Sequence, residues 1–339
     1  MKLDIVIPIY NEEENLAELN RRLKQVCDQQ EGVSWRVIYV NDGSTDRSLE
    51  IMLEQNRKDP RFTIVDLSRN FGHQSAIAAG LAHCAGDAAI FMDGDLQDPP
   101  ELIPELLARW REGKQVVRAQ RRSRKEKGIR RIGFEVFHRL FAWISDYPIP
   151  SHAGIFGLLD RLAVEELKRL PEKNRFFPGL RSWVGFTQDV VCYDREERAA
   201  GEPKQSLKRL VSYALDAVFS FSYKPLRIMT CMGMVISIVG FLLASFFVVK
   251  RLLGIEVAQT GFTTLVTLIL FLGGIQLIAI GLLGEYIARI YDESKKRPLY
   301  IVRGVYGVDA RARGGDLDSQ GDDTPPSRLE KTGARLWVK

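Results

Sequence analysis

Cysteine and histidine are scarce in this chain of 339 residues, which contains four of each. The cysteines share no metal-ligand spacing, and a reduced cytoplasmic compartment is the simplest account of them. They are Cys27, Cys84, Cys192 and Cys231. The sequence also has no Gly-Lys-Ser/Thr phosphate loop and no GxGxxG motif. These absences argue against a nucleoside triphosphatase and against a dehydrogenase.

Charge is absent from two long stretches near the C-terminus, residues 228–249 and 257–284. Each stretch is longer than the roughly 20 apolar residues that a helix needs to cross a bilayer. Core helices of soluble proteins rarely avoid charge for so long, so a buried helix pair is the weaker alternative. The sequence therefore predicts transmembrane helices at 227–250 and 257–288, joined by the short polar break KRLLGIE.

Basic residues flank the two stretches, whereas the break between them contains only Lys250 and Arg251. The flanking residues are Lys204, Lys208, Arg209, Lys224 and Arg227 before the first span, and Arg289, Lys295, Lys296 and Arg297 after the second. Because basic flanks stay on the cytoplasmic side, we expect a multi-pass protein whose N-terminal domain and C-terminus are cytoplasmic. Met1 and Lys2 lead directly into a strand pattern, so no signal peptide is expected.

The formal net charge of +5 is modest, but the basic residues cluster. Residues 204–226 are basic and amphipathic, which predicts an interfacial helix on the membrane. The segment RAQRRSRKEKGIRR, residues 118–131, is open to two interpretations, a solvated loop or a phosphate-binding segment. Such clusters favour an anionic membrane surface or phosphates as partners, and not nucleic acid. Residues 303–339 are rich in Gly, Asp, Arg, Ser and Pro, which predicts a flexible tail.

Strand and helix patterns alternate in the first half of the chain. Strands are expected at 3–9, 35–42, 62–68 and 88–93, with helices at 13–27, 44–56, 74–83 and from 99 onward. Repeated β-α-β units predict an α/β domain, residues 1–203, with a mainly parallel sheet. Three polar clusters, YNEEEN, NDGSTD and DGDLQD, each follow a strand end. Ligands bind at the carboxyl ends of parallel strands, so these clusters should converge on one rim.

The stretch DGDLQDPPE begins at Asp93 and has two interpretations. Acidic residues before Pro-Pro form an ordinary turn and helix start. Alternatively, Asp93, Asp95 and Gln97 present oxygens toward one point, since alternate residues of an extended segment point the same way. Such hard oxygen ligands suit Mg²⁺ or Mn²⁺ held against an anionic substrate. In NDGSTD, Asp42 and Asp46 could accept hydrogen bonds from a ribose hydroxyl or a base N–H, but the motif is also a common turn.

Four segments carry a family resemblance: VIPIYNEEENL, VNDGSTD, LSRNFGHQSAIAAGL and MDGDLQDPPEL. In this order and spacing the chain resembles the family 2 glycosyltransferases. More narrowly, it resembles the polyprenyl-phosphate (dolichyl-phosphate mannose synthase-like) type with two C-terminal transmembrane helices. That type includes the bacterial glucosyl and aminoarabinose transferases of undecaprenyl phosphate. The resemblance covers about residues 1–300, including NRFFPGLRSWVGF, AGEPKQSL and GEYIARIY.

The resemblance implies a GT-A fold, a bacterial inner-membrane location and a set of site residues. The implied nucleotide-sugar contacts are Pro8, Tyr10, Glu12, Asp42, Gln74 and Asp93. Asp93, Asp95 and Gln97 are the implied catalytic, metal-binding residues, holding Mg²⁺ or Mn²⁺ against the diphosphate. Arg121, Arg124 and Arg131 match the residues that contact the acceptor phosphate. His73 is expected to cap or pack at a helix start.

The sequence departs from the family at one place. Many relatives have a Gly-Asp-Phe-Arg segment, whereas this chain has SHAGIFGLLDR, with Ile155 and Gly157 at the acidic and Arg positions. If the acidic residue is a base in those relatives, this chain lacks it. An ionised phosphate acceptor would make the loss tolerable; the alternatives are a different sugar, a different acceptor or lost activity. His152 lies nearby and would either contact the acceptor phosphate or be an ordinary packed or solvated histidine.

The function implied is metal-dependent, inverting transfer of a sugar from a nucleotide donor, UDP-linked, to undecaprenyl phosphate at the cytoplasmic leaflet. The product would be a lipid-linked sugar for a surface glycan or lipid of the cell envelope. A processive polysaccharide synthase is an alternative, but it would need more spans and a Gln-x-x-Arg-Trp motif. A catalytically silent membrane scaffold of the same fold is another. Relatives form tetramers, and the small-residue run GGIQLIAIGLLGE permits close contact with another subunit.

Overall fold

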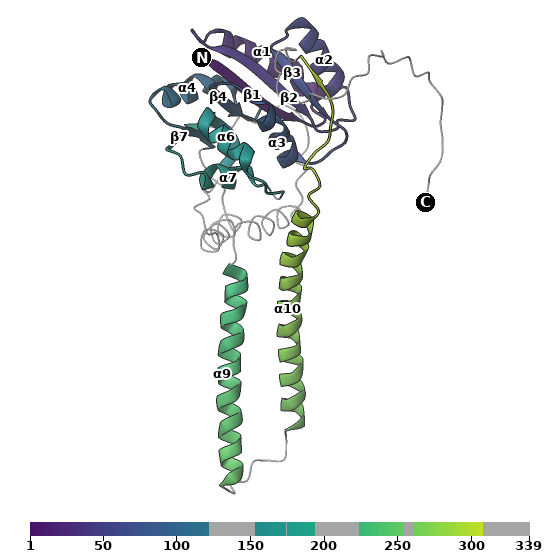
Figure 1. Ribbon diagram of the computed structural model, residues 1–339, viewed down its shortest axis with the longest axis vertical. Helices are drawn as coiled ribbons and strands as arrows, with labels where there is room; N and C mark the ends of the chain where they lie inside the picture. Colours follow the sequence, from purple (N-terminus) through teal and green to yellow (C-terminus); the bar gives the residue numbers. More distant parts are fainter. Residues whose placement is uncertain (122–152, 174, 194–223, 254–260, 308–339) are drawn as a thin grey trace, which may run out of the picture. The chain divides into compact units, whose positions relative to one another are not determined.

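The computed structural model describes residues 1–121, 153–173, 175–193, 224–253 and 261–307 (Figure 1). Arg124, Arg131, His152 and most of the predicted interfacial helix at 204–226 lie outside these ranges. The described part contains an eight-stranded sheet with helices on both faces, followed by two long apolar helices. The GT-A-like α/β architecture that the sequence predicts is thereby confirmed.

The sheet has the strand order β7-β5-β6-β4-β1-β2-β3-β8. Its strands are β1 (Lys2–Ile9), β2 (Ser34–Asn41), β3 (Phe62–Leu67), β4 (Ala88–Phe91), β5 (Val116–Arg121), β6 (Ala153–Asp160), β7 (Gln188–Tyr193) and β8 (Val302–Tyr306). Strand β1 pairs in parallel with both β2 and β4, and β2 pairs in parallel with β3. The four predicted strands thus form a parallel centre, which brings their carboxyl ends to one edge.

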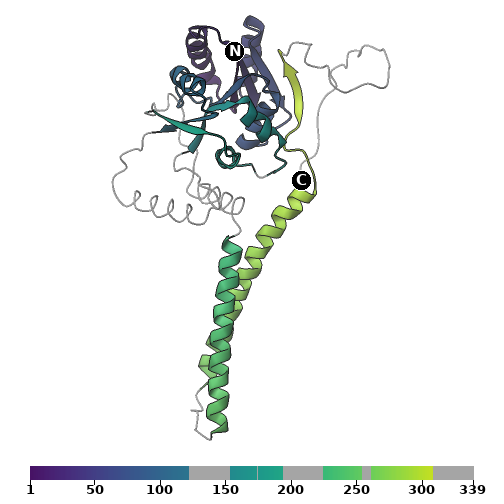
Figure 2. The ribbon, with the colours of Figure 1, turned by 60° about the vertical axis from the view of Figure 1, so that its left-hand side comes forward.

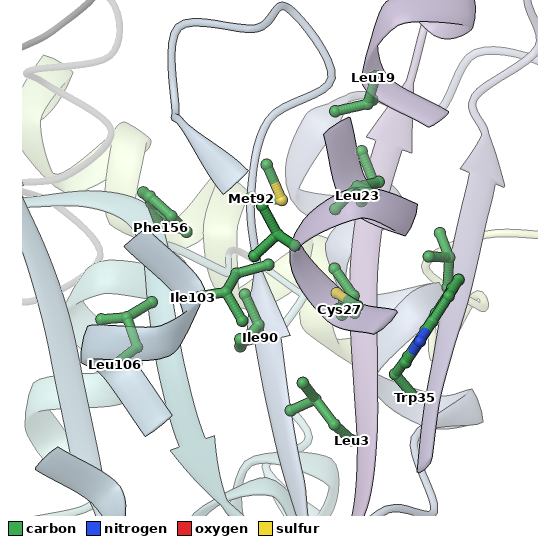
Figure 3. Close-up of a cluster of buried hydrophobic side chains, with 14 of the residues drawn as sticks. Leu3, Leu19, Leu23, Cys27, Trp35, Ile90, Met92, Ile103, Leu106 and Phe156 are labelled. Atoms are coloured by element: carbon green, nitrogen blue, oxygen red, sulfur yellow. The ribbon is translucent and has the colours of Figure 1, made fainter. Parts of the chain in front are cut away.

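Helices cover both faces of the sheet. They are α1 (Glu13–Asp28), α2 (Ser48–Lys58), α3 (His73–His83), α4 (Ile103–Arg111), α6 (Arg161–Arg169) and α7 (Phe177–Trp183), with a 3₁₀ turn, η1 (Pro100–Leu102), before α4. Successive residues of β1 point to opposite faces. Ile5 and Ile7 therefore pack with α1 and α4, whereas Val6 packs with α3. Figure 3 shows the first of these clusters, with Leu19, Leu23 and Cys27 of α1 among the strand side chains.

The two apolar helices are α9 (Lys224–Leu252) and α10 (Phe262–Ser294). Each contains a window of high mean hydropathy, 2.1 at Leu226–Leu243 and 1.6 at Phe271–Ser294, and neither window is buried in the protein. A core helix of a soluble protein would be buried, and a signal sequence would lie near the N-terminus. Side chains such as Phe241 and Leu277, more than two-thirds exposed at 72% and 71%, belong in lipid. The helices therefore associate the protein with a membrane.

Strand β8 corrects the predicted flexible tail, which was expected to begin at residue 303. Residues 302–306 instead form a strand along the edge of the sheet (Figure 2). It pairs antiparallel with β3, with Asp66 opposite Gly304. Val302 and Val305 pack against the cluster that contains Val65 and Leu67. The sheet is thus completed by residues beyond the second apolar helix. The composition of residues 303–339 concealed this strand because it is short and contains a glycine.

Helix α3 packs closely on the sheet at Gly80. A Cβ atom at this residue would lie 2.2 Å from Val6 Cγ1 and 3.1 Å from Val40 Cγ2. Both valines are fully buried strand residues, so neither can move away cheaply. The approach of α3 to β1 and β2 therefore requires glycine.

We expect Gly80→Ala to destabilise the folded domain by about 1–3 kcal/mol through overpacking. The melting temperature of the purified full-length protein in detergent should fall. Gly233→Ala is the matched control, because a Cβ there would meet no atom within 4 Å. An unchanged melting temperature for Gly80→Ala would show that the helix can shift away at no cost.

Candidate active site

The polar loops after β1 and β2 are hydrogen-bonded to each other. The Asn11 backbone N–H donates to Ser44 Oγ at 3.1 Å, and the Thr45 N–H donates to Asn11 Oδ1 at 2.8 Å. The Glu12 N–H donates to Ser48 Oγ at 2.9 Å. Asn11 has a positive φ of 55°, a conformation that asparagine tolerates better than most residues. The clusters YNEEEN and NDGSTD therefore form one structure at the sheet rim, as the sequence predicts.

Asp42 joins this structure to the loop after β3. Its carboxylate accepts hydrogen bonds from the backbone N–H groups of Phe71 at 2.7 Å and Gly72 at 3.0 Å. Asp42 is buried, and burial raises the pKa of its carboxyl group, although the two N–H donors oppose this shift. Gly43 allows the close approach, because a Cβ there would lie 2.4 Å from the Arg69 backbone carbon. Asp42 therefore orders residues 69–72. A contact between Asp42 and the nucleotide base stays a prediction.

The loop after β4 joins the same rim through His73, the first residue of α3. His73 Nε2 lies 2.9 Å from Asp93 Oδ1. Burial lowers the pKa of His73, but the hydrogen bond and charge of Asp93 outweigh burial, and the net shift is upward. His73 lies at a helix start, as expected, and its contact with Asp93 is an addition that the sequence did not predict. All three predicted polar clusters now lie on one rim, linked through Asp42, residues 71–73 and Asp93.

The DGDLQD loop is bent, which corrects the extended geometry expected from the sequence. Leu96 has a φ of 59°, in the left-handed region that leucine rarely adopts. The bend lets the Gln97 N–H donate to Asp95 Oδ1 at 3.2 Å. Simple alternation therefore does not aim Asp93, Asp95 and Gln97 at one point. A strained backbone at such a loop is common in ligand sites.

Asp98, which the sequence reasoning missed, lies buried beneath this loop. Its Oδ1 accepts a hydrogen bond from the Tyr193 hydroxyl at 2.6 Å and one from Arg121 Nη2 at 3.2 Å. Its Oδ2 accepts a longer one from the Asp93 N–H at 3.4 Å. Burial raises the pKa of Asp98, and the charge of Asp93 raises it further, against the opposing effect of Arg121. The place of Asp98 directly before Pro-Pro in the DGDLQDPPE motif could have indicated its role. No sequence pattern around Tyr193 indicates its contact with Asp98.

Arg121 serves this buried cluster. Its Nε donates to the Tyr193 hydroxyl at 3.0 Å, in addition to the contact with Asp98. The Arg121 side chain keeps 28% of its surface exposed, so it is not sealed beneath the loop. Contact with an acceptor phosphate stays a prediction for Arg121, as it does for Arg124 and Arg131 outside the described residues.

The departure from the Gly-Asp-Phe-Arg pattern lies beside a buried arginine. Arg181 of α7 donates from Nη1 to the Ile155 carbonyl and from Nη2 to the Gly154 carbonyl, both at 3.1 Å. Burial, with a smaller contribution from Arg118, lowers the pKa of Arg181 to about 9. A Cβ at Gly157 would lie 2.5 Å from the Val117 carbonyl oxygen and 3.1 Å from Arg181 Nη1. A side chain at residue 157 therefore does not fit this arrangement.

The other predicted nucleotide contacts lie at or near the rim. Tyr10 is exposed, whereas Pro8 is buried in β1. Glu12 accepts a hydrogen bond from Asn15 Nδ2 at 2.6 Å, at the start of α1. The Gln74 side-chain oxygen accepts from the Phe177 N–H of α7 at 2.9 Å. These positions leave the nucleotide contacts as predictions.

The rim offers ligands for a divalent cation, although no group of three or more His, Cys, Asp and Glu side chains in the described ranges forms a ready-made metal site. Asp93 and Asp95 are partly exposed on one loop, whereas Gln97 and Asp98 are buried. Mg²⁺ usually takes one or two carboxylates and completes its shell with water and substrate phosphates. Two carboxylates at a solvent-facing rim fit that donor set.

Comparison with known proteins identifies two matching families. Glycosyl transferase family 2 matches residues 4–162, and the GtrB C-terminal hairpin matches residues 224–290. The uncharacterized glycosyltransferase YkcC of Bacillus subtilis (strain 168) is 46% identical over 310 residues, 91% of this chain and 95% of the relative. The prophage bactoprenol glucosyl transferase homolog of Escherichia coli (strain K12) is 40% identical over 306 residues, 90% and 99% of the two chains. The bactoprenol glucosyl transferase of Shigella phage SfV is 40% identical over 304 residues, 89% and 98%.

The first match covers the parallel strands and the rim loops, and the second covers α9 and most of α10. Both halves of the resemblance drawn from the sequence are therefore confirmed, in the order expected. The chain belongs to the family 2 glycosyltransferases, and it is a glycosyltransferase with a GtrB-type C-terminal hairpin.

Proposed function

We propose that the protein transfers a sugar from a nucleotide donor, UDP-linked, to undecaprenyl phosphate at the cytoplasmic leaflet of a bacterial inner membrane. The observation that carries the proposal is the rim itself, where the loops of Asp42 and Asp93 are tied together and present partly exposed carboxylates. Relatives described as bactoprenol glucosyl transferases support a polyprenyl phosphate acceptor and make glucose the first sugar to test.

In the proposed reaction, the donor diphosphate lies against the rim and the base lies near Asp42, Pro8 and Tyr10. Asp93, Asp95 and Gln97 would hold Mg²⁺ or Mn²⁺, which when bound stabilises the negative charge on the departing diphosphate. His73 would fix the orientation of Asp93 through the contact of 2.9 Å. The chain supplies these groups in fixed positions, which lowers the entropic cost of bringing the reactants together.

The nucleophile would be a phosphate oxygen of the lipid. A phosphate monoester has its second pKa at about 6, so it is largely ionised at neutral pH and has little need of a general base. This explains how the enzyme can tolerate Ile155 and Gly157 at the places of an acidic residue and an arginine in relatives. Arg121, with Arg124 and Arg131 from the basic segment, would fix the phosphate behind the anomeric carbon. Attack from that side inverts the configuration of the sugar.

The apolar hairpin would hold this site at the lipid surface. The basic flanks before α9 and after α10 support an orientation with both ends of the chain in the cytoplasm. The acceptor headgroup and a cytoplasmic nucleotide sugar then meet at the same face of the membrane. The product would be a lipid-linked sugar for a later transfer to a surface glycan or lipid. A homo-oligomer remains a prediction.

Purified full-length protein incubated with undecaprenyl phosphate, Mg²⁺ and radiolabelled UDP-glucose should yield a labelled product soluble in organic solvent. The same assay with a panel of nucleotide sugars identifies the donor. A water-soluble polymer would instead indicate a processive synthase. Donor binding without any product across the panel would indicate a silent scaffold.

Asp95→Ala should abolish transfer, lowering the rate by about 10²-fold or more, because the variant loses a charged ligand where charge develops. Excess EDTA should have the same effect on the wild type, and added Mg²⁺ or Mn²⁺ should reverse it. Glu54→Ala is the matched control, since Glu54 is an exposed carboxylate on α2. Full activity of Asp95→Ala, or turnover undiminished by EDTA, would remove Asp95 and the metal from the mechanism.

Tyr193→Phe should weaken metal binding without touching a predicted ligand. The substitution removes one of the two side-chain donors to buried Asp98 Oδ1, at a cost of about 1–3 kcal/mol for the lost hydrogen bond, while Arg121 remains as the other donor. Asp98 in turn accepts from the Asp93 backbone. We expect the Mg²⁺ concentration for half-maximal transfer to rise several-fold. Tyr306→Phe, on the half-exposed Tyr306 of β8, should leave that concentration unchanged. Equal values for wild type and Tyr193→Phe would contradict a supporting role for Asp98.

A further inference from the structure

Strand β8 forms one edge of the sheet and is separated only by β3 from β2, the strand that leads to Asp42. It follows α10 after the short link of residues 295–301 and pairs antiparallel with β3 (Figure 2). The pairing is interrupted by a bulge: Gly304 lies opposite Asp66 and Val302 lies opposite Leu67, which leaves Arg303 without a partner on β3. Bulges are common beside active sites, where they aim a side chain in a direction that a regular strand would not allow.

The bulge places the Arg303 guanidinium on two groups of β3 and its following loop. Nη2 donates to the Ser68 carbonyl at 2.6 Å, and Nη1 lies 3.5 Å from Asp66 Oδ2. The Asp66 carboxylate is only 1% exposed, whereas 58% of the Arg303 side chain is exposed. The pair is therefore unlike an exposed surface ion pair, because one member is a buried charge that needs a partner.

Both contacts lead to loops of the rim. The other Asp66 oxygen accepts from Asn41 Nδ2 at 2.7 Å, and Asn41 Oδ1 accepts from the Ser44 N–H at 3.1 Å. Asn41 is thereby locked in place directly before Asp42. Ser68 begins the loop whose Phe71 and Gly72 N–H groups bind Asp42. The Ser68 N–H itself donates to the Ile301 carbonyl at 2.9 Å, so the β8 segment holds this loop by backbone as well.

We infer that Arg303 is a positioning residue for the nucleotide donor, and that β8 links the membrane hairpin to the donor pocket. The inference rests on the proposed function, in which Asp42 and its neighbours bind the base. Arg303 acts through Asp66 and Asn41 on the loop of Asp42, and through Ser68 on the loop of Phe71. Among the described residues, its side chain bonds to Asp66 and Ser68 and not to Asp93, Asp95, Gln97 or Arg121, so its effect should fall on the donor.

Arg303→Ala in the full-length protein should raise the KM for the nucleotide sugar by about tenfold, a coupling typical of residues in one hydrogen-bond network. The KM for undecaprenyl phosphate and kcat should change less than about twofold. Arg297→Ala is the control, since it removes an exposed arginine from the link of residues 295–301. Unchanged donor KM in Arg303→Ala would overturn the inference.

Asp66→Asn separates positioning from mere loss of structure. In the double variant Arg303→Ala with Asp66→Asn, no buried charge is left without a countercharge, and the donor KM should return to within about threefold of the wild type. A parallel rise of both KM values with a lower melting temperature, and no recovery in the double variant, would show that Arg303 only stabilises the sheet. If Arg303→Ala does not fold, Arg303→Lys decides: it keeps the charge but loses the two-point contact, and should raise donor KM several-fold.

The failure of this inference is distinguishable from failure of the proposed function. If the wild type makes no lipid-linked sugar from any donor, the proposed function fails. The dissociation constant for UDP, measured with Mg²⁺ by equilibrium dialysis, then decides the role of Arg303. A higher dissociation constant in Arg303→Ala that returns toward the wild-type value in the double variant with Asp66→Asn supports the positioning role of Arg303. Equal dissociation constants in the wild type, Arg303→Ala and the double variant overturn it.

Discussion

Burial of carboxylates behind the rim is the constraint on which the rest of the site depends. Asp42, Asp66 and Asp98 are each at most 3% exposed, and each is satisfied by groups that belong to a different loop or strand. Asp42 holds the Phe71–Gly72 backbone, Asp66 holds Asn41, and Asp98 holds Tyr193 and Arg121. A buried charge without its partners is costly, so the loops must stay where these carboxylates place them. These three buried carboxylates therefore help to fix the loop that carries the partly exposed Asp93 and Asp95.

The charge of so acidic an edge is offset in part by groups of the chain itself. His73 contributes a ring nitrogen to Asp93, and Arg121 supplies positive charge at Asp98, one on each side of the DGDLQD loop. The backbone N–H groups at Asp42 do the same with partial charges. Desolvation is thus offset residue by residue, and the two carboxylates left partly exposed are those with the geometry to meet a ligand from solvent.

Periodicity and strand ends were sufficient to predict the parallel centre, the rim and the apolar hairpin, because each depends on a pattern that is local in sequence. The missed features depend on contacts between distant residues. Tyr193 contacts Asp98, although 95 positions separate them in the sequence. Arg303 contacts Asp66, although both apolar helices lie between them in the sequence. The bend at Leu96 was missed because leucine carries no signal for a positive φ. Strand β8 was hidden within a segment whose overall composition is that of a tail.

Direct location of the cation is the sharpest test of the proposed chemistry at Asp93 and Asp95. Crystals of the full-length protein grown with UDP and Mn²⁺ would give an anomalous signal at the metal. We expect one Mn²⁺ at about 2.1 Å from carboxylate oxygens of the DGDLQD loop and in contact with the UDP diphosphate. A nucleotide bound at the rim with its diphosphate turned away from Asp93 and Asp95, or a cation bound elsewhere, would contradict it.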